Sequence, residues 1–174
     1  MNQKIVVSKL GSSLIASRDT GLYAERINRY VADIRSNYPR HGHIFVVSGA
    51  REMGIHKARK LFSETERALL SDKQLAGLGA TTVFEAFERA HAAIGVAASS
   101  YPITHHLLAG SADPGTLEER HSFINILLGN AERGIASIIN EADAMNDKEL
   151  MRQVLASEYE IDNDQIAAYL ACAV

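Results

Sequence analysis

The sequence predicts an α/β fold of three layers (α/β/α), in which a mainly parallel sheet lies between helices. Three short apolar runs rich in β-branched residues, at 5–7, 43–47 and 135–139, alternate with stretches of helical spacing. Such runs are typical of strands buried on both faces, as in a parallel sheet. Because there are no repeats or obvious linkers, we expect one domain over residues 1–174.

The first strand leads into a lysine and a Gly-Ser-Ser turn. Glycine adopts backbone angles that other residues avoid, so we expect the chain to turn sharply at Gly11. The turn would offer backbone N–H groups and the hydroxyls of Ser12 and Ser13 beside the ammonium group of Lys9. These groups predict an anion-binding loop, and the alternative is an ordinary turn with a solvated lysine.

A helix predicted at about 22–34, which ends before Pro39, and the strand at 43–47 complete a β-loop-α-β unit. The second strand is followed by another small-residue turn, which contains Ser48 and Gly49. In a parallel sheet both turns lie at the same edge, so we expect them to face one cleft.

Residues 51–93 are predicted to form helices, with a break where Ser63 and Glu66 have the spacing of a capping box. The longer helix after the break contains Gly77 and Gly79. A glycine within a helix is unfavourable by about 1 kcal/mol relative to alanine. The two glycines therefore indicate either close packing against another backbone or contact with a ligand.

The elements after residue 93 are a weak strand signal at 96–100, a second short segment around Ile103, a helix at 116–133 capped by Gly134, a short helix at 147–156 and a final helix at 166–173. His105 and His106 lie within this part of the chain. Adjacent histidines point apart on a strand and about 100° apart on a helix, so they are poor joint metal ligands. We expect no metal site there.

Polar residues follow the third strand and precede the last helix. Asn140 and Asp143 come directly after the strand at 135–139, and Asn163 and Asp164 come just before the helix. Capping of that helix by Asn163 or its neighbour Asp162 is the alternative to a role in a site.

The predicted edge combines a lysine, backbone donors, hydroxyls, an amide and carboxylates, without a histidine to act as general base. The chain also lacks the GxxxxGK[ST], GxGxxG and GxSxG motifs. Such a set of groups suits reactions in which positioning and charge neutralisation do most of the catalysis. Phosphoryl transfer is the clearest case, and a carboxylate acceptor would need no base.

Composition narrows the classes of partner and compartment. A net charge of −3 and the absence of tryptophan give no reason to expect nucleic acid or an anionic membrane as a partner. No apolar run approaches the about 18 residues of a membrane span, and the N-terminus lacks the apolar core of a signal peptide. The single cysteine, Cys172, excludes an internal disulfide. We therefore expect a cytoplasmic protein.

Five short segments resemble, in the same order, the glutamate 5-kinase branch of the amino acid kinase family. They are VVSKLGSSL at 6–14, VVSGA at 46–50, KQLAGLG at 73–79, IINEAD at 138–143 and DND at 162–164. The resemblance implies ATP-dependent phosphorylation of the γ-carboxylate of glutamate, the first step of proline synthesis. It also implies ATP as cofactor, with Mg²⁺ carried by the nucleotide and no metal held in a protein cage.

The resemblance also implies roles for individual residues. Lys9 would stabilise the transferring phosphoryl group, and Asp164 would organise the active-site lysines. The positions implied for phosphate binding are Gly11, Ser12 and Ser13. The positions implied for glutamate binding, directly or as support for the pocket, are Ser48, Gly49, Asn140, Asp143 and Asn163.

Departures from the family pattern keep two alternatives open. Ala142 stands where the family usually has Asn, and Ile161 where it usually has Gly. One alternative is a non-catalytic domain that binds an amino acid or a protein; the other is a family kinase for another small carboxylate or phosphate. The family's ATP lobe would follow residue 174. We therefore expect a truncated fold with the N-terminal substrate lobe only, little kinase activity of this chain alone, and a homo-oligomer formed through the surface that the ATP lobe would cover.

Overall fold

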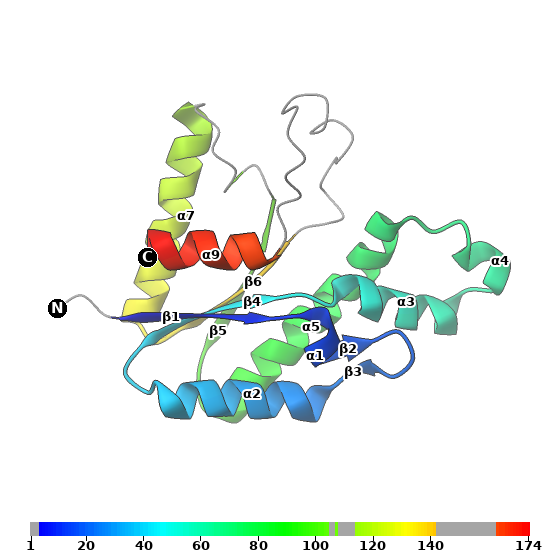
Figure 1. The fold of residues 1–174 in the computed structure, drawn as a ribbon, viewed down its shortest axis with the longest axis horizontal. Helices are drawn as coiled ribbons and strands as arrows, with labels where there is room; N and C mark the ends of the chain where they lie inside the picture. Colours follow the sequence, from blue (N-terminus) through cyan, green and yellow to red (C-terminus); the bar gives the residue numbers. More distant parts are fainter. Residues whose placement is uncertain (1–3, 105–106, 108–113, 142–162) are drawn as a thin grey trace.

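The computed structural model, which describes residues 4–104, 107, 114–141 and 163–174, has an α/β fold built on a parallel sheet (Figure 1). The strands of this sheet are β1 (Ile5–Leu10), β4 (Gly42–Val47), β5 (Ala98–Ile103) and β6 (Ala136–Glu141). Their order across the sheet is β1-β4-β6-β5, and all three pairings are parallel. The prediction of a mainly parallel sheet is confirmed.

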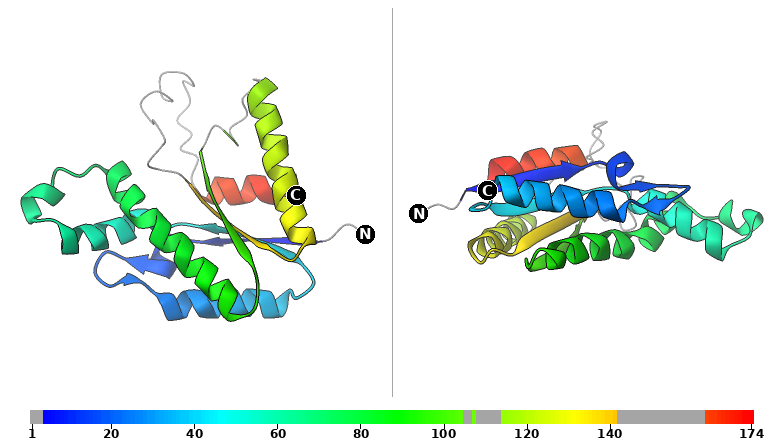
Figure 2. Two further views of the ribbon diagram at one scale, coloured as in Figure 1. Left: turned by 180° about the vertical axis from the view of Figure 1, so that it is seen from behind. Right: turned by 90° about the horizontal axis from the view of Figure 1, so that it is seen from below.

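Helices cover both faces of the sheet, as the three-layer prediction requires (Figures 1 and 2). One face carries α2 (Ala24–Asn37) and α5 (Asp72–Ala93), and the other carries α7 (Pro114–Glu132) and α9 (Asn163–Ala173). Strand β4 contributes to both cores, because successive side chains of a strand point to opposite faces. Phe45 and Val47 pack in the core with α2 and α5, whereas Ile44 and Val46 pack in the core with α7 and α9.

Strand β5 joins the two weak signals at 96–100 and near Ile103 into one continuous strand at the outer edge of the sheet. The strand contains Pro102, which has no N–H to donate. An outer strand tolerates proline because one of its sides has no partner strand.

Two helices and the start of α5 project from the sheet as an arm, defined here as residues 50–79 (Figures 1 and 2). The first is α3 (Ala50–Leu61) and the second is α4 (Glu64–Arg67), which the predicted capping box of Ser63 and Glu66 begins. A Cβ atom built on Gly79 would lie 1.9 Å from the backbone oxygen of Ala50, and one on Gly54 would lie 1.7 Å from that of Leu75. At Gly79 the structure thus shows the close backbone packing that was one of the two alternatives.

Several short elements near the N-terminus were not predicted. They are α1 (Ser12–Ile15), β2 (Ala16–Ser17) and β3 (Gly21–Leu22), of which the last two form a small antiparallel hairpin. The predicted helix at 147–156 and the pair His105 and His106 lie outside the described residues. Within the described residues, no helix is both long and apolar enough to cross a membrane.

Candidate active site

The carboxyl ends of β1 and β4 lie side by side, so the two small-residue turns meet. Leu10 pairs with Val47 at the end of the ladder, and the backbone N–H of Ser48 donates to the carbonyl of Leu10 at 3.1 Å. Strand β6 is the other neighbour of β4. The three predicted strand ends therefore share one edge of the sheet.

The first turn differs from its prediction at Gly11. This glycine has φ −69° and ψ 158°, an extended conformation open to any residue, so the prediction of a special backbone angle is wrong. The chain instead passes directly into α1, which has no side-chain cap. The first N–H groups of a helix have no partner within it, so the backbone around Ser12 and Ser13 keeps donors for an anion.

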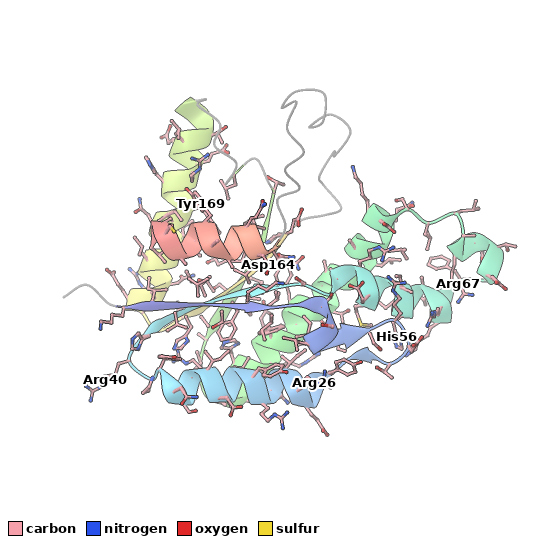
Figure 3. All side chains as sticks on the ribbon, in the orientation of Figure 1. Arg26, Arg40, His56, Arg67, Asp164 and Tyr169 are labelled. Atoms are coloured by element: carbon pink, nitrogen blue, oxygen red, sulfur yellow. The ribbon has the colours of Figure 1, made fainter. Side chains whose placement is uncertain are left out.

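Lys9 and Asp164 meet at this edge although they are far apart in the sequence. The Nζ of Lys9 lies 2.7 Å from Oδ1 of Asp164, which belongs to the first turn of α9 (Figure 3). Both side chains are partly exposed, 32% and 66%, and ion pairs of this kind contribute at most about 1 kcal/mol to stability. A Cβ on Gly11 would lie 3.5 Å from the same Nζ, so the ammonium group lies close to the turn backbone. The ion pair therefore contributes little to stability, and its main effect is to hold the ammonium group of Lys9 in place.

Asn163 begins α9 and carries a buried oxygen without a partner. The described part of α9 starts at this residue, and Asp162, the other residue of the capping alternative, lies outside the described residues. Its Oδ1 is buried and accepts no hydrogen bond from the residues that the structure describes. An unsatisfied buried acceptor costs about 1–3 kcal/mol, which a donor on a bound molecule would recover.

Asn140 lies within the strand and not in a turn after it, which corrects its predicted position. Both Asn140 and Glu141 are buried residues of β6. The Nδ2 of Asn140 donates to the carbonyl of Val47 at 2.5 Å. Because Ser48 follows Val47 directly, this hydrogen bond ties the second turn to β6.

The second turn needs a glycine. Gly49 has φ +92°, in the left-handed region that favours glycine, and it precedes α3. A Cβ at this position would lie 3.2 Å from Cγ1 of Ile15 in α1 and 3.4 Å from Cβ of Ala16. The two turns are therefore packed against each other.

We expect Gly49→Ala to lower the free energy of unfolding by about 2 kcal/mol, because it combines a strained φ with tight contacts to Ile15. Gly11→Ala is the matched control and should change stability by less than about 0.5 kcal/mol, since its φ suits alanine. Urea denaturation of the two variants would check this difference. Equal losses would contradict the conformations described for the two turns.

Arg51 is a residue of this edge that the sequence analysis missed. It follows Gly49 by two positions and pairs with Asp72 at the start of α5, with Nη2 to Oδ1 at 2.8 Å. This ion pair raises the pKa of Arg51. A basic residue directly after the Ser-Gly-Ala turn is the signal that could have identified it.

Asp143 lies outside the described residues. Among the residues that are described, no group of three His, Cys, Asp or Glu side chains is arranged to hold a metal ion. Lys9 lies beside the first turn of α1 and pairs with Asp164, and the neighbour of Asp164 in the sequence, Asn163, carries a buried oxygen that accepts no hydrogen bond from the described residues.

A family model described as "Amino acid kinase family" matches residues 4–174. No curated protein matches the chain.

Proposed function

The chain belongs to the amino acid kinase family, and from this premise we propose that it phosphorylates the γ-carboxylate of glutamate with ATP. Membership indicates a phosphotransferase that uses ATP and acts on an amino acid or a related carboxylate. The observation that carries the proposal is the ion pair of Lys9 and Asp164 beside the α1 turn. The segments that resemble glutamate 5-kinases support glutamate as the substrate.

Lys9 would act on the charge of the reacting phosphoryl group. ATP, when bound with Mg²⁺, supplies that group. In phosphoryl transfer, charge spreads over the phosphoryl oxygens, and a fixed cation that meets them lowers the barrier. Asp164, at 2.7 Å, holds the ammonium group at the edge of the sheet. Backbone N–H groups near Ser12 and Ser13 would donate to phosphate oxygens.

The acceptor would need no general base. A glutamate side chain has a pKa of about 4.3, so its carboxylate is already ionised at neutral pH. The ammonium group of the amino acid would donate to Oδ1 of Asn163, which has no partner within the described chain. Ser48 would contact the substrate from a turn that Asn140 holds in place through the carbonyl of Val47.

Calorimetric titration with glutamate tests this function. We expect saturable binding that Asn163→Ala weakens about 10-fold, because a hydrogen bond from a charged donor is lost. Asn125→Ala, on the exposed face of α7, is the matched control and should bind like the parent chain. Binding that Asn163→Ala leaves unchanged would contradict the assignment of the site.

A panel of small carboxylates and inorganic phosphate separates the alternatives. Tighter binding of another acid or of phosphate would favour a different substrate within the family. A folded chain that binds none of them would favour a protein-interaction domain. Coupled ADP release, measured with this chain and with a chain extended by any sequence that follows Val174, then reports turnover, which Lys9→Met should abolish.

A further inference from the structure

Glutamate has one charged group that the contacts of the proposed function leave unpaired, its α-carboxylate. In that function the γ-carboxylate meets the phosphoryl group beside Lys9, and the ammonium group donates to Asn163. The α-carboxylate is also ionised at neutral pH. A carboxylate that leaves water without a hydrogen-bonded or charged partner is strongly destabilised. A second cation, besides Lys9, is therefore required at the same edge of the sheet.

Arg51 is a cation that comes directly after the second turn. It lies two positions after Gly49, in the first turn of α3, which begins at the carboxyl end of β4. Asp72, in the first turn of α5, accepts from Nη2 of Arg51 at 2.8 Å. Figure 1 shows α3 leading away from the end of β4, with the start of α5 close to it. The guanidinium group is therefore at the base of the arm, next to the turn that contains Ser48.

The guanidinium group of Arg51 keeps donors that the described residues do not use. Its Nε is buried and has no hydrogen-bond partner among those residues. Its Nη1 lies 3.9 Å from Oε1 of Glu52, which is too long for a hydrogen bond. The same carboxylate oxygen lies 4.0 Å from Nη2 of Arg18, so Glu52 is shared between two cations. A further carboxylate would satisfy the Nε–H, because carboxylate oxygens fit the planar fork of a guanidinium group.

The side chain of Arg51 is both held and accessible. It is 36% exposed, so a ligand can reach it from solvent. The hydrogen bond to Asp72 holds one nitrogen of the group and raises the pKa of Arg51, so the side chain stays charged. A side chain that is ordered before the substrate arrives loses less entropy on binding it.

We propose that Arg51 binds the α-carboxylate of the acceptor and thereby selects dicarboxylic amino acids. This inference rests on the proposed function, because it concerns the other end of the same substrate. The Nε–H of Arg51 donates to an α-carboxylate oxygen, and Asp72 keeps the guanidinium group in position. Lys9 then acts at the reacting end of the acceptor and Arg51 at the end that does not react. An acceptor with a single carboxylate lacks the contact with Arg51.

NMR titration of the full chain with glutamate and with 4-aminobutyrate tests this specificity. 4-Aminobutyrate keeps the ammonium group and the carboxylate that would react, but it lacks the α-carboxylate. We expect the chain to bind glutamate about 30-fold more tightly, because the charged hydrogen bond to Arg51 is missing with the other ligand. Arg51→Met should weaken glutamate binding about 30-fold and leave 4-aminobutyrate binding unchanged. Asn163→Ala should weaken both ligands alike, since both carry the ammonium group.

Two further variants separate substrate binding from a structural role. Lys60→Met removes a cation from the last turn of the same helix and should leave both affinities unchanged. Asp72→Asn loosens the guanidinium group and should weaken glutamate binding about 3-fold without an effect on 4-aminobutyrate. Thermal melting followed by circular dichroism would show that each variant is folded.

The outcomes distinguish this inference from the function on which it rests. Equal affinity of the parent chain for the two ligands, or equal weakening of both by Arg51→Met, would overturn the role of Arg51. Glutamate binding that Asn163→Ala weakens and Arg51→Met does not would overturn this role and leave the proposed function standing. A chain that binds neither ligand would overturn both.

Discussion

Replacing Gly79 with alanine is expected to lower the free energy of unfolding by at least about 3 kcal/mol. The new Cβ would lie 1.9 Å from the carbonyl oxygen of Ala50 and 2.6 Å from the backbone nitrogen of Gly54. Both are backbone atoms, which cannot rotate away as a side chain does. The helices α3 and α5 would have to separate, and α3 begins at the second turn of the candidate site. Chemical denaturation of the variant measures the loss.

Gly129→Ala is the matched control for this experiment. Gly129 also lies inside a helix, α7, but a Cβ there would meet only the end of the flexible Arg133 side chain, at 3.0 Å. Alanine has the higher helix propensity, so this variant should be unchanged or more stable by up to about 1 kcal/mol. Similar stability of the Gly79 and Gly129 variants would show that the two helices do not pack through their backbones.

Lowering the pH from 7 to 4 is expected to cost about 3 kcal/mol of stability through His43 alone. The side chain is buried, and its Nε2 donates to the carbonyl of Tyr38 at 3.0 Å. Its Nδ1 is buried without a partner, so a proton added there would find no acceptor. Burial, together with the positive charge of Arg35, lowers the pKa of His43 from 6.5 to about 4.

The direction of the pH effect follows from these two pKa values. Below about 6.5 the unfolded chain takes up a proton at His43, whereas the folded chain does not until about pH 4. The stabilisation is therefore complete above pH 6.5 and is lost as the pH falls toward 4. His91 acts in the same sense, because burial lowers its pKa and its Nε2 has no partner. His91 packs edge-on against Phe45, and its nearby charges include Arg35.

Urea denaturation at a series of pH values between 7 and 4 measures this effect. The variant His43→Gln removes the titrating group and should lose less stability over this range than the parent chain. His121→Gln changes an exposed histidine of α7 and should reproduce the parent curve. If His43→Gln and the parent chain had the same slope, the buried imidazole would not be the source of the acid sensitivity.

The parts of the fold that depend on neighbours in the sequence were predicted well. The strand containing Phe45, the capping box of Ser63 and Glu66, and the helix stop at Gly134, which has φ +72°, all depend on residues within a few positions. The parallel sheet followed from the alternation of such elements. Part of the candidate site was also predictable. The carboxyl ends of parallel strands lie at the same edge of a sheet, even when the strands are far apart in the sequence.

Contacts across the fold could not be predicted in this way. Gly11 was expected to need its conformational freedom, but it is extended, and the positive φ is at Gly49, the residue directly before α3. Asn140 was expected in a turn, yet it continues β6, because its side chain finds an acceptor in the neighbouring strand. The burial of His43 depends on α2 and α5, because its ring stacks on Phe45 and lies near Arg35 of α2 and His91 of α5.

By itself the sequence determined the α/β class, the longer strands and helices, and the set of groups at the sheet edge, with Lys9 just before the first turn. Local preferences and hydrophobic periodicity are sufficient for these features, because they act over a few residues. Only the tertiary structure decided that Lys9 meets Asp164, that the buried oxygen of Asn163 has no partner among the described residues, and that Leu69 in the arm is exposed. Each of these features depends on which residues the folded chain brings together and which it leaves exposed. Patterns over a few neighbouring residues do not determine this.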